Sequence, residues 1–137
     1  MTTADVAPAV GPTISEVMSR PVLTIEDSES LWDAWQLLFV SGLRHLVVLD
    51  ADGRTIGVLT DRSILADLPA TQEHLSERRV SDVLARVPAH SVTPHQSPIA
   101  AAHLMTDRSI EALPVLDDTG RLVGILTETD IVRWVAR

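Results

Sequence analysis

The sequence lacks several residue types that would point to particular chemistries. It contains no cysteine, which excludes disulfide bonds, thiolate catalysis and cysteine-ligated metal sites. It has no tyrosine and a single phenylalanine, so its core must consist mainly of Leu, Val, Ile and Ala. The five histidines show no metal-ligand spacing. No nucleophile elbow, phosphate loop or paired-carboxylate motif is present, and we therefore expect neither a bound metal nor an enzyme.

Basic residues and long apolar runs are also scarce. Eleven basic residues stand against nineteen acidic ones, and the net charge of −8 argues against nucleic acid or an anionic membrane as a partner. A small anionic ligand stays possible, because it needs only one or two local cations. No apolar run approaches the ~18–20 residues of a membrane span. The N-terminus lacks the pattern of a secretory signal, so we expect a cytoplasmic protein.

The most informative feature that is present is an internal repeat. Residues 46–60 read LVVLDADGRTIGVLT and residues 113–127 read LPVLDDTGRLVGILT, with nine of fifteen positions identical at a constant offset of 67. A repeat of this length is one supersecondary unit, which predicts a tandem pair. Each copy of about 55–60 residues would bury too little surface to be stable alone, so the two copies should share a core.

The pattern of apolar residues predicts the same elements in both copies. We expect an α/β (α+β) fold of two α-β-α-β-β-α repeats packed about a pseudo-two-fold axis. The expected boundaries are a flexible tail at 1–12, repeat 1 at 13–68, a polar linker at 69–79 and repeat 2 at 80–137. The expected core residues of the long helices, at helical spacing, are Leu31, Ala34, Trp35 and Leu38 in repeat 1 and Ile99, Ala102, Leu104 and Met105 in repeat 2. The three tryptophans, Trp32, Trp35 and Trp134, should lie in the core or at a dimer interface.

Both copies of the fifteen-residue segment end with a threonine, where a strand is expected to meet a helix. Thr60 and Thr127 occupy natural N-cap positions, and Thr127 with Asp130 has capping-box spacing. Such a pair is common at helix starts in any protein, so capping alone can account for it. Capping and ligand binding are also compatible.

Two segments carry a resemblance to a known family. Gly57-Val58-Leu59-Thr60 and Gly124-Ile125-Leu126-Thr127-Glu128-Thr129-Asp130, each after an apolar strand and an Asp-x-x-Gly turn, resemble the cystathionine-β-synthase (CBS) domain. Two such domains in tandem, covering residues 13–136, resemble a Bateman module. The resemblance implies a regulatory protein that binds an adenosyl ligand (AMP, ADP, ATP, S-adenosylmethionine or NAD) between the repeats, without a tightly bound cofactor. It also implies a homodimer, a disc of four CBS domains, that signals to a partner protein the sequence does not identify.

The resemblance implies one composite pocket with the full set of ligand-binding residue types, which we call site A. Asp130 would accept hydrogen bonds from the ribose hydroxyls, and Thr127 would contact ribose or phosphate at the helix start. Arg44 can meet a phosphate with its guanidinium fork, or it can be a surface arginine paired with a carboxylate such as Asp50. The implied residues are Met18, Pro21, Val22, Leu23, Leu43, Arg44, Ile125, Thr127 and Asp130.

The mirror-image pocket, site B, departs from the family pattern. Ser63 stands where site A has its aspartate, and Glu111 stands where site A has Arg44. A hydroxyl accepts ribose hydrogen bonds less strongly than a carboxylate, and Glu111 repels phosphate. We expect site B to be empty, to bind weakly or to prefer an uncharged or cationic ligand. Its implied residues are Val58, Thr60, Ser63, Pro88, Ala89, His90, Ile110 and Glu111.

A different class of function stays open beside ligand sensing. The repeats can serve only to build a stable dimer, as a ligand-independent scaffold with vestigial clefts. The altered site B favours this alternative. The two hypotheses differ at Asp130, whose replacement by alanine abolishes ligand binding under sensing and only removes a helix cap under scaffolding.

Overall fold

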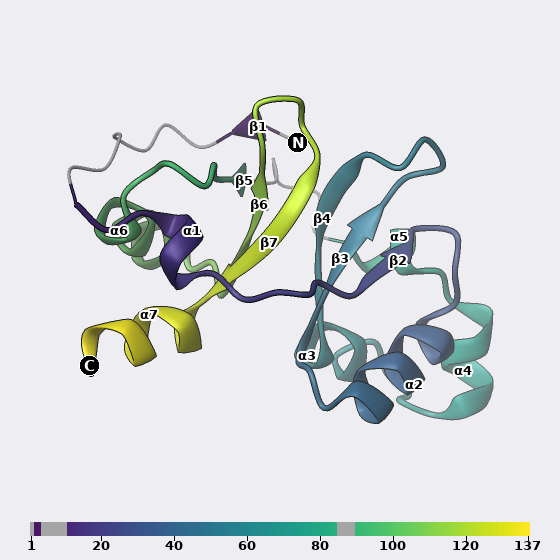
Figure 1. Cartoon of the computed structure of the whole chain (residues 1–137). Helices are drawn as coiled ribbons and strands as arrows, with labels where there is room; N and C mark the ends of the chain where they lie inside the picture. Colours follow the sequence, from purple (N-terminus) through teal and green to yellow (C-terminus); the bar gives the residue numbers. More distant parts are fainter. Residues whose placement is uncertain (1, 4–10, 85–89) are drawn as a thin grey trace. The chain divides into compact units, whose positions relative to one another are not determined.

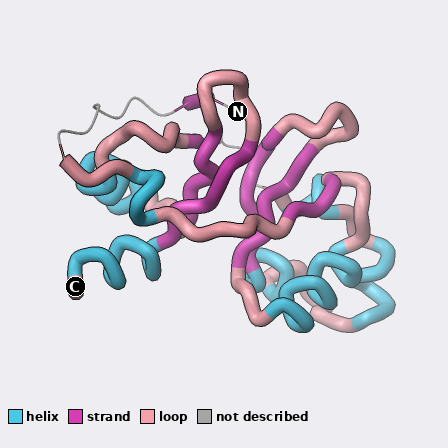
Figure 2. Tube along the Cα trace, in the orientation of Figure 1, coloured by secondary structure: helices cyan, strands magenta, loops and turns pink. Residues whose placement is uncertain are grey.

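A computed structural model of the chain describes residues 2–3, 11–84 and 90–137, and it contains the expected mixture of helices and strands (Figures 1 and 2). None of the helices in these three ranges has the length and apolar composition needed to cross a membrane. In chain order the elements are β1 (Thr2–Thr3), α1 (Ile14–Val17), β2 (Thr24–Glu26), α2 (Leu31–Ser41), β3 (His45–Leu49), β4 (Thr55–Thr60), α3 (Asp61–Leu65), α4 (Gln72–Glu77), α5 (Val80–Val83), β5 (His90–Ser91), α6 (Pro98–Arg108), β6 (Ala112–Leu116), β7 (Leu122–Thr127) and α7 (Glu128–Val135).

The first repeat builds a three-stranded sheet in the order β2-β3-β4. Strand β2 runs parallel to β3, and β3 pairs antiparallel with β4. The hairpin turns at Gly53, whose φ of 80° suits glycine. The Asp50 carboxylate fixes this turn by accepting hydrogen bonds from the backbone N–H groups of Asp52 and Arg54, each at 2.9 Å. Sequence reasoning predicts the turn from Gly53 but misses the part played by Asp50.

The second repeat repeats this plan with small differences. Strands β6 and β7 pair antiparallel around a turn at Gly120, where φ is 83°. A bridge between Val92 and Val115 brings the short edge segment beside β6, as β2 lies beside β3. Strand β1 pairs in parallel with β5. Residues 2 and 3 of the expected flexible tail are therefore in a strand, while residues 1 and 4–10 lie outside the described part of the chain.

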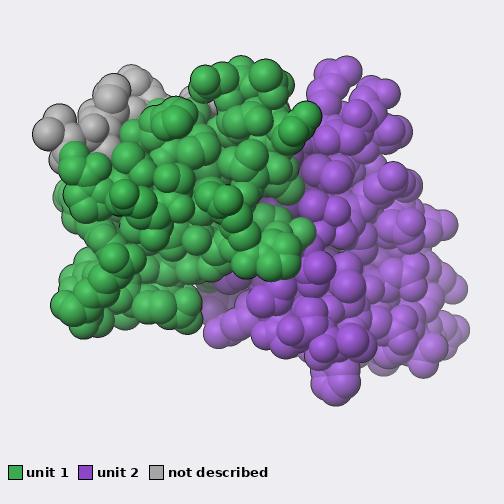
Figure 3. All heavy atoms as spheres, in the orientation of Figure 1, with its two compact units in different colours: residues 1–22, 88–137 green, residues 23–87 purple. Residues whose placement is uncertain are grey.

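The compact units of the structure divide the chain differently from the sequence repeats. One unit comprises residues 1–22 and 88–137, and the other comprises residues 23–87 (Figure 3). We call them unit 1 and unit 2. Helix α1 of repeat 1 thus belongs to the unit that holds the strands of repeat 2, and α5 packs with the strands of repeat 1. Ile14 and Val17 of α1 are buried among Val92, Met105 and Leu126, and Val80 of α5 is buried with Leu46 and Leu59.

A glycine in each hairpin receives the residue that follows the short helix. A Cβ atom at Gly124 would lie 2.5 Å from Met18 Sδ in unit 1, and one at Gly57 would lie 2.9 Å from Leu84 Cδ1 in unit 2. Both distances are too short for a real contact, so each glycine makes room for the side chain. The repeated glycine thus lets Met18 lie against β7 in unit 1 and Leu84 lie against β4 in unit 2.

The expected helix cores are confirmed in part. Leu31, Ala34 and Leu38 are buried, whereas Trp35 is half-buried against the same cluster. In α6 the buried side chains are Ala101 and Met105, and the expectation for Ile99 is wrong because 49% of it is exposed. Ala102 and Leu104 are half-buried. The helix therefore packs against the core through the face that contains Pro98, Ala101 and Met105.

The connecting segment is more ordered than its polar composition suggests. Helix α4 forms within the expected linker, begins at the N-cap Thr71 and buries Leu75 against the core of unit 2. The Asp67 carboxylate accepts two hydrogen bonds from Arg78, at 2.8 and 3.2 Å, and pairs with His74 Nε2 at 2.9 Å. The hydrogen bonds from Arg78 are the main cause that lowers the pKa of Asp67. Burial of the carboxylate opposes this decrease, and His74 adds to it.

Candidate functional site

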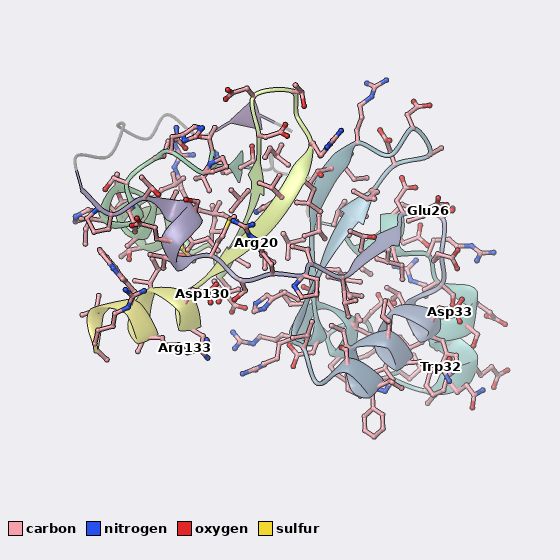
Figure 4. All side chains as sticks on the ribbon, in the orientation of Figure 1. Arg20, Glu26, Trp32, Asp33, Asp130 and Arg133 are labelled. Atoms are coloured by element: carbon pink, nitrogen blue, oxygen red, sulfur yellow. The ribbon has the colours of Figure 1, made fainter. Side chains whose placement is uncertain are left out.

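The predicted ribose-binding aspartate, Asp130, lies in the first turn of α7 (Figure 4), and it is buried. Only 4% of Asp130 is exposed. Its Oδ2 atom accepts a hydrogen bond from the Thr127 backbone N–H at 2.9 Å, and its own N–H donates to Thr127 Oγ1 at 3.2 Å. The capping box predicted from the spacing is therefore confirmed. A carboxylate in this place also interacts favourably with the positive end of the helix dipole.

The other carboxylate oxygen of Asp130 has a partner that sequence reasoning misses. Ser19 Oγ donates to Asp130 Oδ1 at 2.6 Å, across 111 positions of sequence. The backbone of Ser19 is held on both sides, because its N–H donates to Ile125 O at 2.8 Å and its carbonyl accepts from Ile125 N–H at 3.2 Å. Residues of repeat 1 and repeat 2 thus meet at Asp130 within unit 1.

The residues implied for site A are divided between the two units. Unit 1 contains Met18, Pro21, Val22, Ile125, Thr127 and Asp130, whereas unit 2 contains Leu23, Leu43 and Arg44. Met18 packs on Gly124, beside the buried Ile125. Two basic residues of unit 1 that we did not single out, Arg20 and Arg133, are close to these residues in the sequence and are labelled in Figure 4. Arg20 follows Ser19, and Arg133 lies three residues after Asp130; both are exposed.

Arg44 has an acidic partner, but a different one from the residue suggested by the sequence. Its Nε donates to Asp61 Oδ2 at 3.3 Å, and the side chains of the two residues are 67% and 30% exposed. The Asp50 carboxylate is occupied by its own turn, which corrects the alternative pairing. Most of the Arg44 side chain nevertheless faces solvent. An anion can therefore compete for it.

Site B contains the two hydroxyls that the sequence predicts, and they pair with each other. Thr60 Oγ1 and Ser63 Oγ lie 2.9 Å apart, and the Ser63 N–H donates to Thr60 Oγ1 at 3.0 Å. Thr60 is therefore the N-cap of α3, as expected. Val58, Thr60 and Ser63 belong to unit 2, and His90, Ile110 and Glu111 to unit 1. Pro88 and Ala89 lie outside the described residues.

Glu111 and Arg44 occupy equivalent places in their units. The N–H of Glu128, the first residue of α7, donates to Glu111 O at 3.1 Å, and the N–H of Asp61, the first residue of α3, donates to Arg44 O at 3.2 Å. The alignment of the two repeats at this position is thus reproduced by the backbone. The exchange of a cation for a carboxylate at one structural position distinguishes the two units.

A shallow pocket on unit 2 contains none of the predicted site residues. It has a volume of about 450 Å³ and is lined by Thr24, Ile25, Glu26, Glu29, Asp33, Leu37 and Leu49. Its three acidic side chains, two of which are labelled in Figure 4, disfavour a phosphate. Within residues 2–3, 11–84 and 90–137, no group of three or more His, Asp or Glu side chains is placed to hold a metal ion.

Comparison with known proteins establishes the family. The CBS domain family matches residues 14–70 and residues 80–137. The chain therefore belongs to the CBS domain family, with two copies of the domain in tandem. A CBS domain-containing protein from Dictyostelium discoideum is 30% identical over 128 residues, which cover 87% of this chain and 88% of that protein.

Other relatives are much longer than this chain. A homoserine O-acetyltransferase from Methanococcoides burtonii is 32% identical over 122 residues, covering 89% of this chain but 24% of that protein. A second one, from Methanohalophilus mahii, is 34% identical and is covered over 25% of its length. The chain thus spans about a quarter of the acetyltransferases that it matches. The name describes whole proteins, and about three quarters of each lies outside the matched region.

Solved structures confirm the fold. A CBS domain protein of unknown function from Thermoplasma acidophilum has a TM-score of 0.79 at 28% identity, covering 91% of this chain and 70% of that one. CBSX2, solved in complex with AMP, has a TM-score of 0.76 at 30% identity, covering 92% and 97%. The CBS domain pair of protein MJ0100, in complex with 5′-methylthioadenosine and S-adenosyl-L-methionine, has a TM-score of 0.78 at 25% identity, covering 90% and 98%.

Proposed function

We propose that this CBS domain pair is a regulatory module that binds an adenosyl ligand at site A and passes a conformational change to a partner protein. The observation that carries the proposal is the Asp130 carboxylate, held by a capping box at the start of α7 in a chain of this family. It is the acceptor that a ribose diol requires. Two similar CBS proteins, solved with AMP and with S-adenosyl-L-methionine, support the same ligand class.

The other parts of the proposed site come from both units, with Met18, Ile125 and Thr127 in unit 1 and Arg44 in unit 2. Thr127 lies at the N-terminus of an eight-residue helix, where backbone N–H groups favour an anion. Ile125 and Met18 offer apolar surface for the base. Arg44, which is largely exposed despite its pairing with Asp61, is the proposed phosphate contact. We propose no catalytic role, because binding and release of a ligand suffice for regulation.

The test is a thermal-shift panel with AMP, ADP, ATP, S-adenosylmethionine and NAD, followed by titration calorimetry. A ligand at ~100 times its dissociation constant adds about 2.7 kcal/mol to the free energy of unfolding. Asp130→Asn keeps the size of the side chain, loses the charge and should abolish the shift. Ser63→Ala, at the equivalent position of unit 2, is the matched control and should leave it intact. Absence of a shift and of binding heat with all five compounds would overturn the proposal.

Site B is proposed to discriminate against phosphorylated ligands. Ser63 and Glu111 give it a neutral hydroxyl and a carboxylate where site A has Asp130 and Arg44. Calorimetry with AMP should therefore give one site per chain. Ser63→Asp with Glu111→Arg should raise the number of sites to two, and an unchanged stoichiometry would argue against the assignment of these positions.

A ligand-independent scaffold is the second candidate, favoured by apolar side chains on the surface of α2. Phe39 and Val40 are 79% and 84% exposed near the end of this helix. We propose that a second copy of the chain covers them, giving the homodimer implied by the family. Light scattering should find a dimer that Phe39→Asp converts to a monomer. Thr106→Asp, at the equivalent position of α6, should remain dimeric, and a monomeric wild type would refute this part.

A further inference from the structure

Ser19 occupies the acceptor that the proposed ligand needs. Its hydroxyl lies 2.6 Å from Asp130 Oδ1, a short distance that is typical of a hydroxyl donating to a charged oxygen. The backbone of Ser19 is fixed to Ile125 by two hydrogen bonds, at 2.8 and 3.2 Å. The hydroxyl can therefore leave the carboxylate by rotation about χ1 alone, without movement of the main chain.

Because Asp130 is buried, Ser19 and a ligand hydroxyl would compete for the same carboxylate oxygen. With 4% of the residue exposed, little of the carboxylate is accessible beside the two donors already present. The Thr127 N–H occupies Oδ2 as part of the helix cap, and Ser19 occupies Oδ1. An incoming hydroxyl must therefore replace a donor instead of adding to the set. Ser19 is the donor that can yield, because its loss leaves the start of α7 intact.

We propose that Ser19 is an internal competitor that sets the affinity and the hydroxyl requirement of Asp130; this inference rests on the proposed function. In the free protein its hydroxyl stands in for a ribose hydroxyl. A ligand with a correctly placed hydroxyl displaces it and restores the hydrogen bond. A ligand without that hydroxyl leaves either Ser19 in place or the carboxylate unpaired. The apparent affinity is the intrinsic affinity multiplied by the fraction of molecules in which Oδ1 is free of Ser19.

The sequence provides a contrast at the equivalent position. The short helices of the two repeats align with an offset of 66, so Ser19 corresponds to Ala85. Alanine has no hydroxyl, and the aspartate that Ser19 contacts corresponds to Ser63. Unit 1 thus contains both the donor and the acceptor of this pair, whereas the equivalent positions of the sequence, which belong to unit 2, have alanine and serine.

The experiment measures AMP binding by calorimetry on the full chain and on three variants. Ser19→Ala should bind AMP about tenfold more tightly, because a hydrogen bond to a charged group no longer has to be broken. Ser19→Thr keeps the hydroxyl and should stay within about twofold of the wild type. Ser15→Ala is the control for loss of a serine hydroxyl, because Ser15 Oγ in α1 lies 2.9 Å from Thr13 Oγ1 at the N-cap; it should also resemble the wild type.

Deoxy analogues separate competition from a structural effect. The gain in Ser19→Ala should be present with AMP and absent with whichever of 2′-deoxy-AMP and 3′-deoxy-AMP lacks the hydroxyl that reaches Oδ1. Equal gains with AMP and both analogues would overturn the proposal, as would unchanged or weaker AMP binding in Ser19→Ala. Either of these outcomes would leave the proposed function in place, provided that the wild type binds AMP and Asp130→Asn does not. If neither the wild type nor Ser19→Ala binds any of the five adenosyl compounds, both fall.

Discussion

Replacing Asp130 by alanine should destabilise the fold as well as remove the ligand contact. The side chain accepts from Ser19 Oγ at 2.6 Å and from the Thr127 N–H at 2.9 Å, and 4% of the residue is exposed. Hydrogen bonds to a charged group contribute about 1.5–3 kcal/mol each. Truncation also relieves the cost of burying the carboxylate, which opposes the loss. We expect a net decrease of about 2–3 kcal/mol in the free energy of unfolding.

The measurement is chemical denaturation at neutral pH together with thermal unfolding. For a chain of this size a loss of 1 kcal/mol lowers the melting temperature by roughly 3–4 °C, so Asp130→Ala should lose roughly 6–12 °C. Asp130→Asn keeps one acceptor oxygen and should lose about half as much. The unligated protein is used throughout, so that ligand binding does not contribute.

Ser63→Ala is the matched control for this prediction. Ser63 has the same place at the start of α3, but its hydroxyl makes one neutral hydrogen bond, to Thr60 at 2.9 Å. Its removal should cost about 0.5–1 kcal/mol. Equal losses for Asp130→Ala and Ser63→Ala would refute the reasoning, because they would show that the Ser19 contact and the charge contribute nothing.

Three further predictions concern parts of the fold that support the site. Chiefly because of Arg78, the pKa of Asp67 in the folded protein lies below its unfolded value. The pair therefore stabilises the protein above about pH 4, and this stabilisation is lost as the pH falls through the folded-state pKa. In Asp67→Asn the denaturation midpoint should depend less on pH in this acid range. Gly124→Ala should cost about 1–3 kcal/mol, because its Cβ would lie 2.5 Å from Met18 Sδ, and Met18→Ala should recover part of the loss in the double variant. Leu46→Ala, at a fully buried position of β3, should cost about 2–5 kcal/mol in denaturant unfolding.

Local signals in the sequence predict the hairpins and the helix starts well. Strands β3 (His45–Leu49) and β6 (Ala112–Leu116) are the apolar strands expected before each Asp-x-x-Gly turn. Thr60 and Thr127 cap their helices as the spacing indicates. These features depend on residues within one turn or one hairpin, so the repeat pattern contains enough information to place them.

Contacts that join distant segments were beyond the reach of sequence reasoning. The partner of Asp130 lies 111 positions away, and nothing in the local pattern around Ser19 marks it as a donor to α7. Arg44 pairs with Asp61 across 17 positions, because the turn at Gly53 brings the ends of the hairpin together. The face of α6 was predicted wrongly at Ile99 because a helix with several alanines has a weak apolar stripe.

The exchange of short helices makes the fold of unit 1 and the geometry at Asp130 depend on the same segment. Helix α1 contributes Ile14 and Val17 to the core of unit 1, and the next residues bring Ser19 to Ile125 and Asp130. A fragment of residues 88–137 lacks both contributions. It should therefore unfold without cooperativity when isolated, since the loss of two buried aliphatic side chains costs several kcal/mol, on the order of 2–5 for each site.

A synthetic peptide of residues 11–22 should restore the missing part. Added in excess, it should bind the fragment 88–137 and produce a cooperative thermal transition, because it supplies Ile14 and Val17 to the core. An Ile14→Ala peptide should bind more weakly by a large factor, whereas a Ser19→Ala peptide keeps the core contacts and should lose only the hydrogen bond to Asp130. A cooperative transition of the fragment without any peptide would contradict this account, because the strands and helices of repeat 2 would then form a complete core by themselves.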